Sequence, residues 1–392
     1  MGFGGVAEAL CKMSFGNAFG VDVKMDEEEL FNLSYGSIVV ETDGTLDFDR
    51  AVLLGTVTDG EDGDLHINGV RASIFELMDF NLSPFDKVYP AVSTPDFTRT
   101  APRGLQGEKP AKAPKETLRY PGEAVERPLV YLPVFPGTNC DYDSAKAFRK
   151  AGAQVEMGVF RNLTEQDVNE SIERMKDAID RCHILMLSGG FSAGDEPDGS
   201  GKFIASVLNN ALVGGAIERL LGRGGLILGI CNGFQALVKS GLLPYGKLGQ
   251  VTADSPTLFR NDIGRHVSQM VTTRVASTAS PWLAGMHVGD LHAIPVSHGE
   301  GKFVVNEQLA AELFRRGQVA FQYVDPVTEE VTMESPYNPN GSYYAIEGIL
   351  SPDGHILGKM GHSERYEDDL FKNIETEKAQ PLFENAVKYF RK

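Results

Sequence analysis

The feature that most constrains this chain is a cysteine placed between two glycines at the end of an apolar run. Residues 225–230 predict a buried strand, and helical spacing begins at Asn232. Gly229 and Gly233 stand two residues before and after Cys231, a spacing that allows the sharp strand-to-helix turn called a nucleophile elbow. This turn places the thiol at a helix N-terminus, where the dipole favours a thiolate and free N–H groups can bind an oxyanion. We therefore predict that Cys231 is a nucleophile rather than a buried structural cysteine.

Composition and charge exclude several classes of protein. No apolar run among the 392 residues approaches the length of a membrane span, and the first residues lack a secretory signal pattern, so we expect a cytoplasmic protein with no membrane partner. The net charge of −17 argues against nucleic acid, whose binding needs a basic stripe. The four cysteines have neither disulfide-framework nor metal-ligand spacing, which fits a reducing compartment. Cys140 and Cys182 are interpreted as core or near-core residues, and no metal site is expected.

Charge and composition divide the chain into three parts. The net charge is −12 over residues 1–95, +2 over residues 96–127 and −7 over residues 128–392. Residues 96–127 are rich in Pro, Lys, Gly and Thr and show no apolar periodicity, which predicts a linker. Residues 1–95 open with a helix and continue with strand-like runs at 37–41 and 51–57. This pattern predicts a small α+β unit that is incomplete.

The third part alternates apolar runs with amphipathic stretches and then becomes β-rich. The expected strands are 129–134, 154–159, 183–187 and 226–229, and the expected helices are 141–151, 164–180, 202–221 and one after 232. This order predicts an α/β protein with a parallel sheet covered on both faces. Further strands are expected at 266–277, 318–324, 343–350 and 356–359, followed by a helical tail over 365–392. Ligands of such sheets bind at the carboxyl ends of strands, where Gly189, Gly190 and Cys231 fall.

A cysteine nucleophile needs a base, a group that orients the base, and oxyanion donors. Two of the eight histidines, His298 and His362, have a glutamate two residues further along the chain, Glu300 and Glu364. Spacing alone does not choose between them.

The neighbours of the elbow supply candidate donors. The oxyanion would be held by the N–H of Asn232 and by one N–H from the turn Gly189-Gly190-Phe191 on the adjacent strand. Gln235 follows Cys231 by one helical turn, so its amide could meet a polar substrate.

These motifs together resemble the class I glutamine amidotransferases, whose signature is Gly-x-Cys-x-Gly-x-Gln followed far downstream by His-x-Glu. Six motifs in order carry a closer resemblance to the amidotransferase domain of the phosphoribosylformylglycinamidine synthases, the glutamine-dependent ligases of purine biosynthesis. The motifs begin at Pro136, Ser188, Gly229, Pro295, Asn338 and Gly361. The resemblance covers residues 128–392 almost continuously.

The resemblance implies a flavodoxin-like fold with a mostly parallel sheet and a β-rich insertion. It implies that Cys231 is the nucleophile, His362 the general base and acid, and Glu364 its orienting partner. It also implies contacts with the substrate glutamine from Gly189, Gly190, Phe191, Asn232 and Gln235. The role of His298 stays open. The commoner family pattern is Pro-His-Pro-Glu-Arg, whereas this chain reads Gly361-His-Ser-Glu-Arg365, which predicts a less rigid loop.

The first part of the chain resembles the other half of the same enzymes. Residues 3–10 and 14–20 are similar to their aminoimidazole-ribotide-synthetase-like C-terminal domain. The chain would then be the C-terminal part of a synthase, and its partners would be synthetase domains. The resemblance implies that ATP and Mg²⁺ belong to that missing half and that this chain needs no cofactor.

Two other functions remain open at this stage. The same elbow serves cysteine hydrolases and peptidases, which would turn over esters or peptides and ignore glutamine. Alternatively, the chain could be a non-catalytic subunit that docks onto a separate synthetase, although a retired site has no need of all three of Cys231, His362 and Glu364.

Overall fold

The computed structural model describes residues 2–44, 46, 48–59, 64–84, 118–192 and 200–391. The chain divides into two compact units, residues 1–91 and 92–392. Most of the predicted linker over 96–127 lies outside the described residues. Its described end is packed, because Tyr120 is buried against the rings of Tyr389 and Phe390. None of the helices in these ranges is long and apolar enough to cross a membrane.

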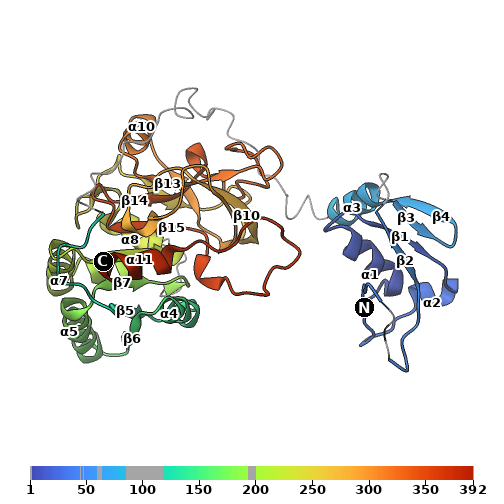
Figure 1. Cartoon of the computed structure of the whole chain (residues 1–392), viewed down its shortest axis with the longest axis horizontal. Coiled ribbons are helices and arrows are strands. Elements are labelled where there is room, and N and C mark those ends of the chain that lie inside the picture. The colour runs from blue at the N-terminus through green and yellow to red at the C-terminus, as the bar shows by residue number, and fades with distance from the viewer. Residues whose placement is uncertain are drawn as a thin grey trace. The chain divides into compact units, whose positions relative to one another are not determined.

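The small unit is an α+β structure built on four short strands. Its elements are α1 (Gly5–Ser14), β1 (Gly20–Val23), α2 (Glu27–Phe31), β2 (Gly55–Thr58), β3 (Asp64–Ile67), β4 (Val70–Ser73) and α3 (Ile74–Leu82). The strand order is β2-β1-β3-β4, with β1 and β3 parallel (Figure 1). The expected strand at 37–41 is wrong: these residues are mostly exposed and form no strand, because no neighbouring strand pairs with them. A strand does form near the second expected position, as β2.

The large unit carries the elements that build the site. Its strands are β5 (Leu129–Val134), β6 (Gln154–Val159), β7 (Ile184–Leu187), β8 (Leu226–Ile230), β9 (Thr257–Phe259), β10 (Val267–Val275), β11 (Leu291–His298), β12 (Lys302–Val304), β13 (Val319–Val324), β14 (Ile346–Leu350) and β15 (Ile356–Lys359). Its helices are α4 (Asp141–Lys150), α5 (Glu165–Arg181), α6 (Lys202–Leu208), α7 (Ala211–Gly222), α8 (Asn232–Ser240), α9 (Leu242–Tyr245), α10 (Glu307–Arg315) and α11 (Leu382–Arg391).

One nine-stranded sheet organises this unit, in the order β11-β10-β13-β14-β15-β8-β7-β5-β6. The strands from β15 to β6 are parallel, and those from β15 to β11 pair antiparallel. In chain order the parallel strands run 2-1-3-4-5, which is the flavodoxin-like doubly wound order. The sheet is therefore mixed. The β-rich segment mostly extends this sheet, and only β9 and β12 pair separately.

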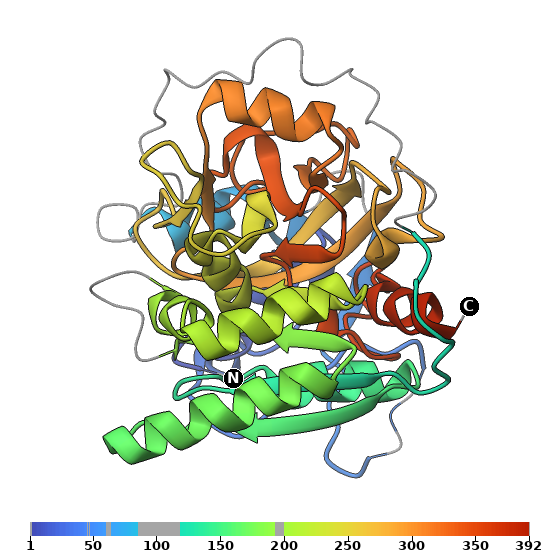
Figure 2. The same ribbon diagram turned by 90° about the vertical axis from the view of Figure 1, so that its left-hand side faces the viewer.

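Helices cover both faces of the parallel half. Helices α5 and α7 pack on each other, and α4 contacts α11, the edge strand β6 and its neighbour β5. Figure 2 shows the long green helix α5 running beside the same edge of the sheet. The central strands β7 and β8 are buried at every position, as the continuous apolar runs predicted.

Three expected elements differ in their extent. The helix expected over 202–221 is two helices, because Asn210 caps a new helix by accepting from the N–H of Leu212. The strand expected over 343–350 begins at Ile346, after a 3-10 turn at Tyr343–Ala345. The predicted helical tail over 365–392 contains a helix only at Leu382–Arg391 within its described residues, apart from the end of a 3-10 turn.

Candidate active site

The predicted elbow is present between β8 and α8. Cys231 has φ 52° and ψ −107°, a strained backbone conformation for a residue with a side chain. The flanking glycines are required by close packing: a Cβ on Gly233 would lie 2.0 Å from the carbonyl oxygen of Leu187, and one on Gly229 would lie 2.8 Å from the Gly233 backbone. The N–H of Cys231 donates to the Lys359 carbonyl at 2.9 Å, which ties the turn to β15. These contacts with β7, α8 and β15 keep Cys231 in its strained backbone conformation.

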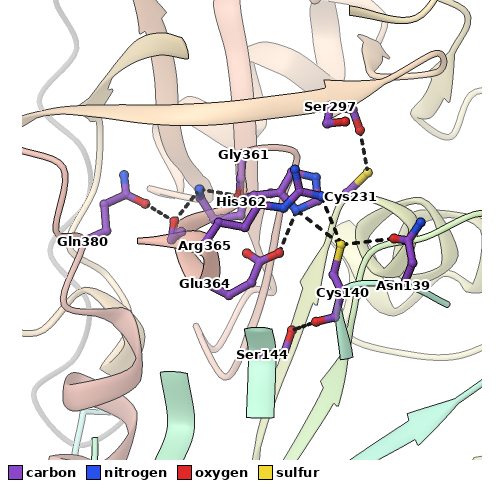
Figure 3. Close-up of polar contacts among 12 residues, drawn as sticks. Asn139, Cys140, Ser144, Cys231, Ser297, Gly361, His362, Glu364, Arg365 and Gln380 are labelled. Carbon is purple, nitrogen blue, oxygen red and sulfur yellow. Dashed lines mark hydrogen bonds and ion pairs between the residues drawn. The ribbon is translucent and has the colours of Figure 1, made fainter. Parts of the chain in front are cut away.

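Beside the thiol lies a buried histidine–carboxylate pair. His362 Nδ1 and Glu364 Oε1 are 2.6 Å apart, and both side chains are almost fully buried. The ring nitrogen Nε2 of His362 makes no hydrogen bond within the described residues. Figure 3 shows the Cys231 thiol next to this ring, with its sulfur 3.6 Å from the Ser297 carbonyl oxygen that accepts from it. The carboxylate fixes the proton on Nδ1, so Nε2 is the nitrogen that can exchange a proton with the thiol or the substrate.

Gly189 explains why these side chains can meet. A Cβ on Gly189 would lie 2.9 Å from His362 Cε1, 3.1 Å from Cys140 Sγ and 3.4 Å from Cys231 Cβ. The absent side chain therefore leaves the space in which the imidazole and the two cysteines converge.

The electrostatics favour a charged imidazole. Burial opposes the charge of His362, but the Glu364 carboxylate and the thiols of Cys140 and Cys231 outweigh it and raise the pKa of His362 well above its ordinary value. Burial likewise works against the carboxylate, yet His362 and Arg365 lower the pKa of Glu364. The pair is therefore ionic at neutral pH.

His298 occupies a different environment from His362. Its Nδ1 lies 3.2 Å from Asn261 Oδ1, and burial, with the nearby His362 and His266, lowers the pKa of His298 to about 3. Glu300 does not orient it, because its carboxylate accepts from the N–H of Ser200 at 2.8 Å. Spacing could not choose between His298 and His362. Of the two, only His362 has its imidazole ring hydrogen-bonded to the glutamate two residues further along.

The residues expected to contact the substrate surround the elbow. Asn232 Nδ2 donates to Gln235 Oε1 at 2.9 Å, and Gln235 Nε2 donates to the Glu300 carbonyl, so the Gln235 amide links α8 to the loop after β11. Phe191 is 46% exposed, and its N–H donates to the Gly137 carbonyl at 2.8 Å. That Asn232, Gln235 and Phe191 touch glutamine stays a prediction.

Gly189 and Gly190 form the other wall of the site. The carbonyl of Gly189 accepts from the N–H groups of Asn139 and Cys140. A Cβ on Gly190 would lie 2.5 Å from the Gly137 carbonyl oxygen. The turns that follow β5 and β7 are thus joined by hydrogen bonds and close packing. They meet at the topological switch point of the sheet, where ligands of this fold bind. Their contact with glutamine also stays a prediction.

Sequence reasoning missed the position of Cys140. It is buried, as expected, but its sulfur lies 3.9 Å from His362 Nδ1 and accepts from Arg365 Nη2 at 3.2 Å (Figure 3). Its place after the loop that follows β5, the first strand of the parallel sheet, was the available signal. Cys140, His362 and Glu364 are also the one group among the described residues whose donor atoms could hold a metal. The Arg365 guanidinium and the His362–Glu364 bond already engage those atoms, so the site does not favour a cation.

Fold and site together are those of a class I glutamine amidotransferase. Residues 127–390 match the family model described as CobB/CobQ-like glutamine amidotransferase domain, so the chain belongs to this family. The match does not include the small unit.

Two similar proteins, both PurQ subunits, support this assignment. The chain is 33% identical over 254 residues to phosphoribosylformylglycinamidine synthase subunit PurQ of Gloeobacter violaceus, covering 65% of this chain and 94% of that protein. It is 33% identical over 275 residues to PurQ of Methanococcus maripaludis, covering 65% and 96%. Among solved structures, that of PurLQS from Thermotoga maritima matches with a TM-score of 0.48 and 25% identity, covering 67% of this chain and 99% of that one.

Proposed function

We propose that this chain is the glutaminase part of a phosphoribosylformylglycinamidine synthase and serves purine biosynthesis. In this proposal it hydrolyses glutamine to glutamate and ammonia. The observation that carries the proposal is the buried His362–Glu364 pair beside Cys231 at a strained elbow, in a domain that is 33% identical to PurQ proteins over most of their length.

The chemistry needs a thiolate, an oxyanion site and one proton carrier. The Cys231 thiolate attacks the side-chain carbonyl carbon of glutamine, and the tetrahedral oxyanion is held by the N–H of Asn232 and an N–H of the turn at residues 189–191. His362 then gives its proton to the leaving nitrogen, so ammonia departs and a γ-glutamyl thioester remains. His362 next takes a proton from water, which attacks the thioester, and glutamate and the Cys231 thiol are released. Glu364 holds the ring in place throughout.

The ammonia has a partner reaction elsewhere in the enzyme. We propose that it passes to an ATP-activated formylglycinamide ribotide in synthetase domains, which hold ATP and Mg²⁺. The small unit would be a part of such a domain, similar to the C-terminal domain of aminoimidazole-ribotide synthetases. Its apolar surface supports this: Ile38, Leu53 and Phe80 are each more than three-quarters exposed. In this proposal, other parts of the synthetase domain cover these side chains.

We also propose that the protein works in the cytoplasm. The cysteines of the described residues are all free, which fits a reducing compartment.

An activity assay tests the proposal. The full chain is incubated with glutamine, and glutamate release is measured with and without a complementary synthetase and its nucleotide substrates. We expect glutamate release that the synthetase stimulates and that Cys231→Ala abolishes. Hydrolysis of esters or peptides with no turnover of glutamine would support the alternative of a cysteine hydrolase. Binding to the synthetase with no hydrolysis at all would support a docking subunit.

A further inference from the structure

The loop that carries His362 rests on a buried ion pair that the mechanism above does not use. Lys359 ends β15 and Glu347 lies in the adjacent strand β14. Both side chains are fully buried, with Nζ and Oε1 3.4 Å apart. Removing two charges from water costs roughly several kcal/mol per ion, so such a pair is retained only with further hydrogen bonds.

Those further hydrogen bonds go to the two neighbours of His362. Lys359 Nζ donates to the Gly361 carbonyl and to Ser363 Oγ, each at 2.9 Å. The Gly361 N–H donates to Glu347 Oε1 at 2.6 Å. The ammonium thus donates two hydrogen bonds beside His362 and forms an ion pair with Glu347. The ion pair therefore holds the backbone of Gly361 and the side chain of Ser363, on either side of His362.

The hydrogen bonds continue into the C-terminal segment. Ser363 Oγ donates to Gln380 Oε1 at 2.5 Å, and Gln380 Nε2 donates to Thr273 Oγ1 of β10 at 3.5 Å. The hydroxyl of Ser363 thus stands between the Lys359 ammonium and an amide anchored to the sheet. Figure 3 shows Gln380 beside the loop that carries Gly361 and His362.

The same lysine also holds the nucleophile. Its carbonyl accepts the N–H of Cys231 at 2.9 Å, while its side chain holds the loop of His362. One residue thereby bonds the backbone of Cys231 through its carbonyl and both neighbours of His362 through its ammonium.

The loop composition fits this arrangement. A less rigid loop was expected because Gly361 and Ser363 stand where the family pattern has proline. Here both residues use groups that proline lacks, an N–H and a hydroxyl, to bond the ion pair. A Cβ on Gly361 would also lie 2.1 Å from Ile294 Cδ1 and 2.9 Å from Glu347 Oε1, so the isoleucine and the carboxylate together occupy the space that a larger residue would need.

We propose that Lys359 and Glu347 are positioning residues, whose ion pair holds residues 361–363 so that His362 meets Cys231. The kinetic readout of this inference rests on the proposed function. A second readout, the reaction of Cys231 with iodoacetamide, needs only the thiol and its histidine.

The decisive variant replaces both charges by apolar side chains, Lys359→Met with Glu347→Leu. Replacing a buried ion pair by apolar side chains is often neutral or stabilising. If the pair had only a structural role, its replacement would therefore lower neither the stability nor the activity of the protein. We expect a melting temperature close to that of the wild type, because no charge is left buried but the Gly361 N–H and carbonyl lose their hydrogen-bond partners. We expect kcat for glutamine to fall at least about tenfold with KM little changed, because small misplacements of catalytic groups are costly. The iodoacetamide rate at pH 7 should fall by a similar factor.

A matched control removes a buried amide that lies just before β13. Gln318 is buried and donates to the carbonyls of Pro244 and Leu350, each at 2.9 Å. Gln318→Met should lower the melting temperature and leave kcat and the iodoacetamide rate unchanged.

Wild-type kcat and iodoacetamide rate in a folded double variant would overturn the inference. Should the double variant not fold, Ser363→Ala decides, since it removes only the hydroxyl between Lys359 and Gln380. A severalfold loss of kcat or iodoacetamide rate in Ser363→Ala supports the inference, and wild-type rates overturn it. A wild-type chain that reacts with iodoacetamide at Cys231 yet never turns over glutamine would reject the proposed function, and the alkylation rates would still decide the inference.

Discussion

At the scale of single residues, the site depends on where protons are held. Glu364 raises the pKa of His362, and His362 lowers the pKa of Glu364. For His362 the stability gained is full below its ordinary pKa of 6.5 and is lost as pH rises through its raised folded pKa. For Glu364 it is full above the ordinary pKa of 4.5 and is lost as pH falls through its lowered folded pKa. The pair therefore contributes most between those two ordinary values.

Glu364→Gln tests this arrangement. The amide cannot stabilise an imidazolium, so the pKa of His362 should fall and glutaminase activity should decrease about 100-fold or more. The difference in unfolding free energy between wild type and variant should be largest between pH 4.5 and 6.5 and shrink on either side. Denaturant unfolding across pH and a pH–rate profile measure both effects. A variant with the wild-type pH–rate profile would contradict the role given to Glu364.

At the scale of elements, the elbow depends on the close approach of α8 to β7. A methyl group on Gly233 would lie 2.0 Å from the Leu187 carbonyl oxygen, a backbone atom that cannot rotate away. Gly233→Ala should therefore destabilise the protein by about 1–3 kcal/mol, as overpacking does, and reduce glutamate release. Gly222→Ala in α7 is the matched control, because nothing lies within 4 Å of its Cβ. It should keep activity and stability. Thermal melts with activity assays compare the two, and a fully active Gly233→Ala would refute the packing argument.

The elements that the sequence predicted well are those with local signals. The apolar run of β8, the flanking glycines and the downstream His-x-Glu all lie in the sequence itself, so the elbow and the two candidate histidines could be recognised. The choice of His362 came from the family resemblance, and the structure adds the ring contact of Glu364 and the isolation of His298 from Glu300.

The features that escaped prediction depend on contacts between distant segments. Cys140 joins the site because the turns after β5 and β7 are laced together. The β-rich segment extends the main sheet because β14 pairs with β15. Nothing in the sequence of β15 indicates this pairing. The Lys359–Glu347 pair lies on adjacent strands whose register no local pattern reveals.

At the scale of the whole molecule, the two units have separate cores. The core of the small unit includes Leu65 and Ile74, and that of the large unit begins at Tyr120. The N–H of Val125 donates to the Phe390 carbonyl, so the start of the large unit is joined to its last helix.

A chain that begins at residue 118 tests this independence. It should melt at the temperature of the large unit in the full chain, because it keeps every described residue of that unit's core. Its Cys231 should react with iodoacetamide at the full-chain rate. Differential scanning calorimetry with alkylation kinetics measures both. An unfolded product, or one whose thiol reacts at a clearly different rate, would show that the large unit needs the preceding residues.

The central claim is that Cys231 is the nucleophile of a glutamine site, and labelling tests it most directly. The full chain is treated with the glutamine analogue 6-diazo-5-oxo-L-norleucine, with and without excess glutamine, and the modified residue is mapped by mass spectrometry. We predict one label, on Cys231, at a rate that glutamine slows. A label on Cys140 instead, or labelling of Cys231 that glutamine does not slow, would contradict the account.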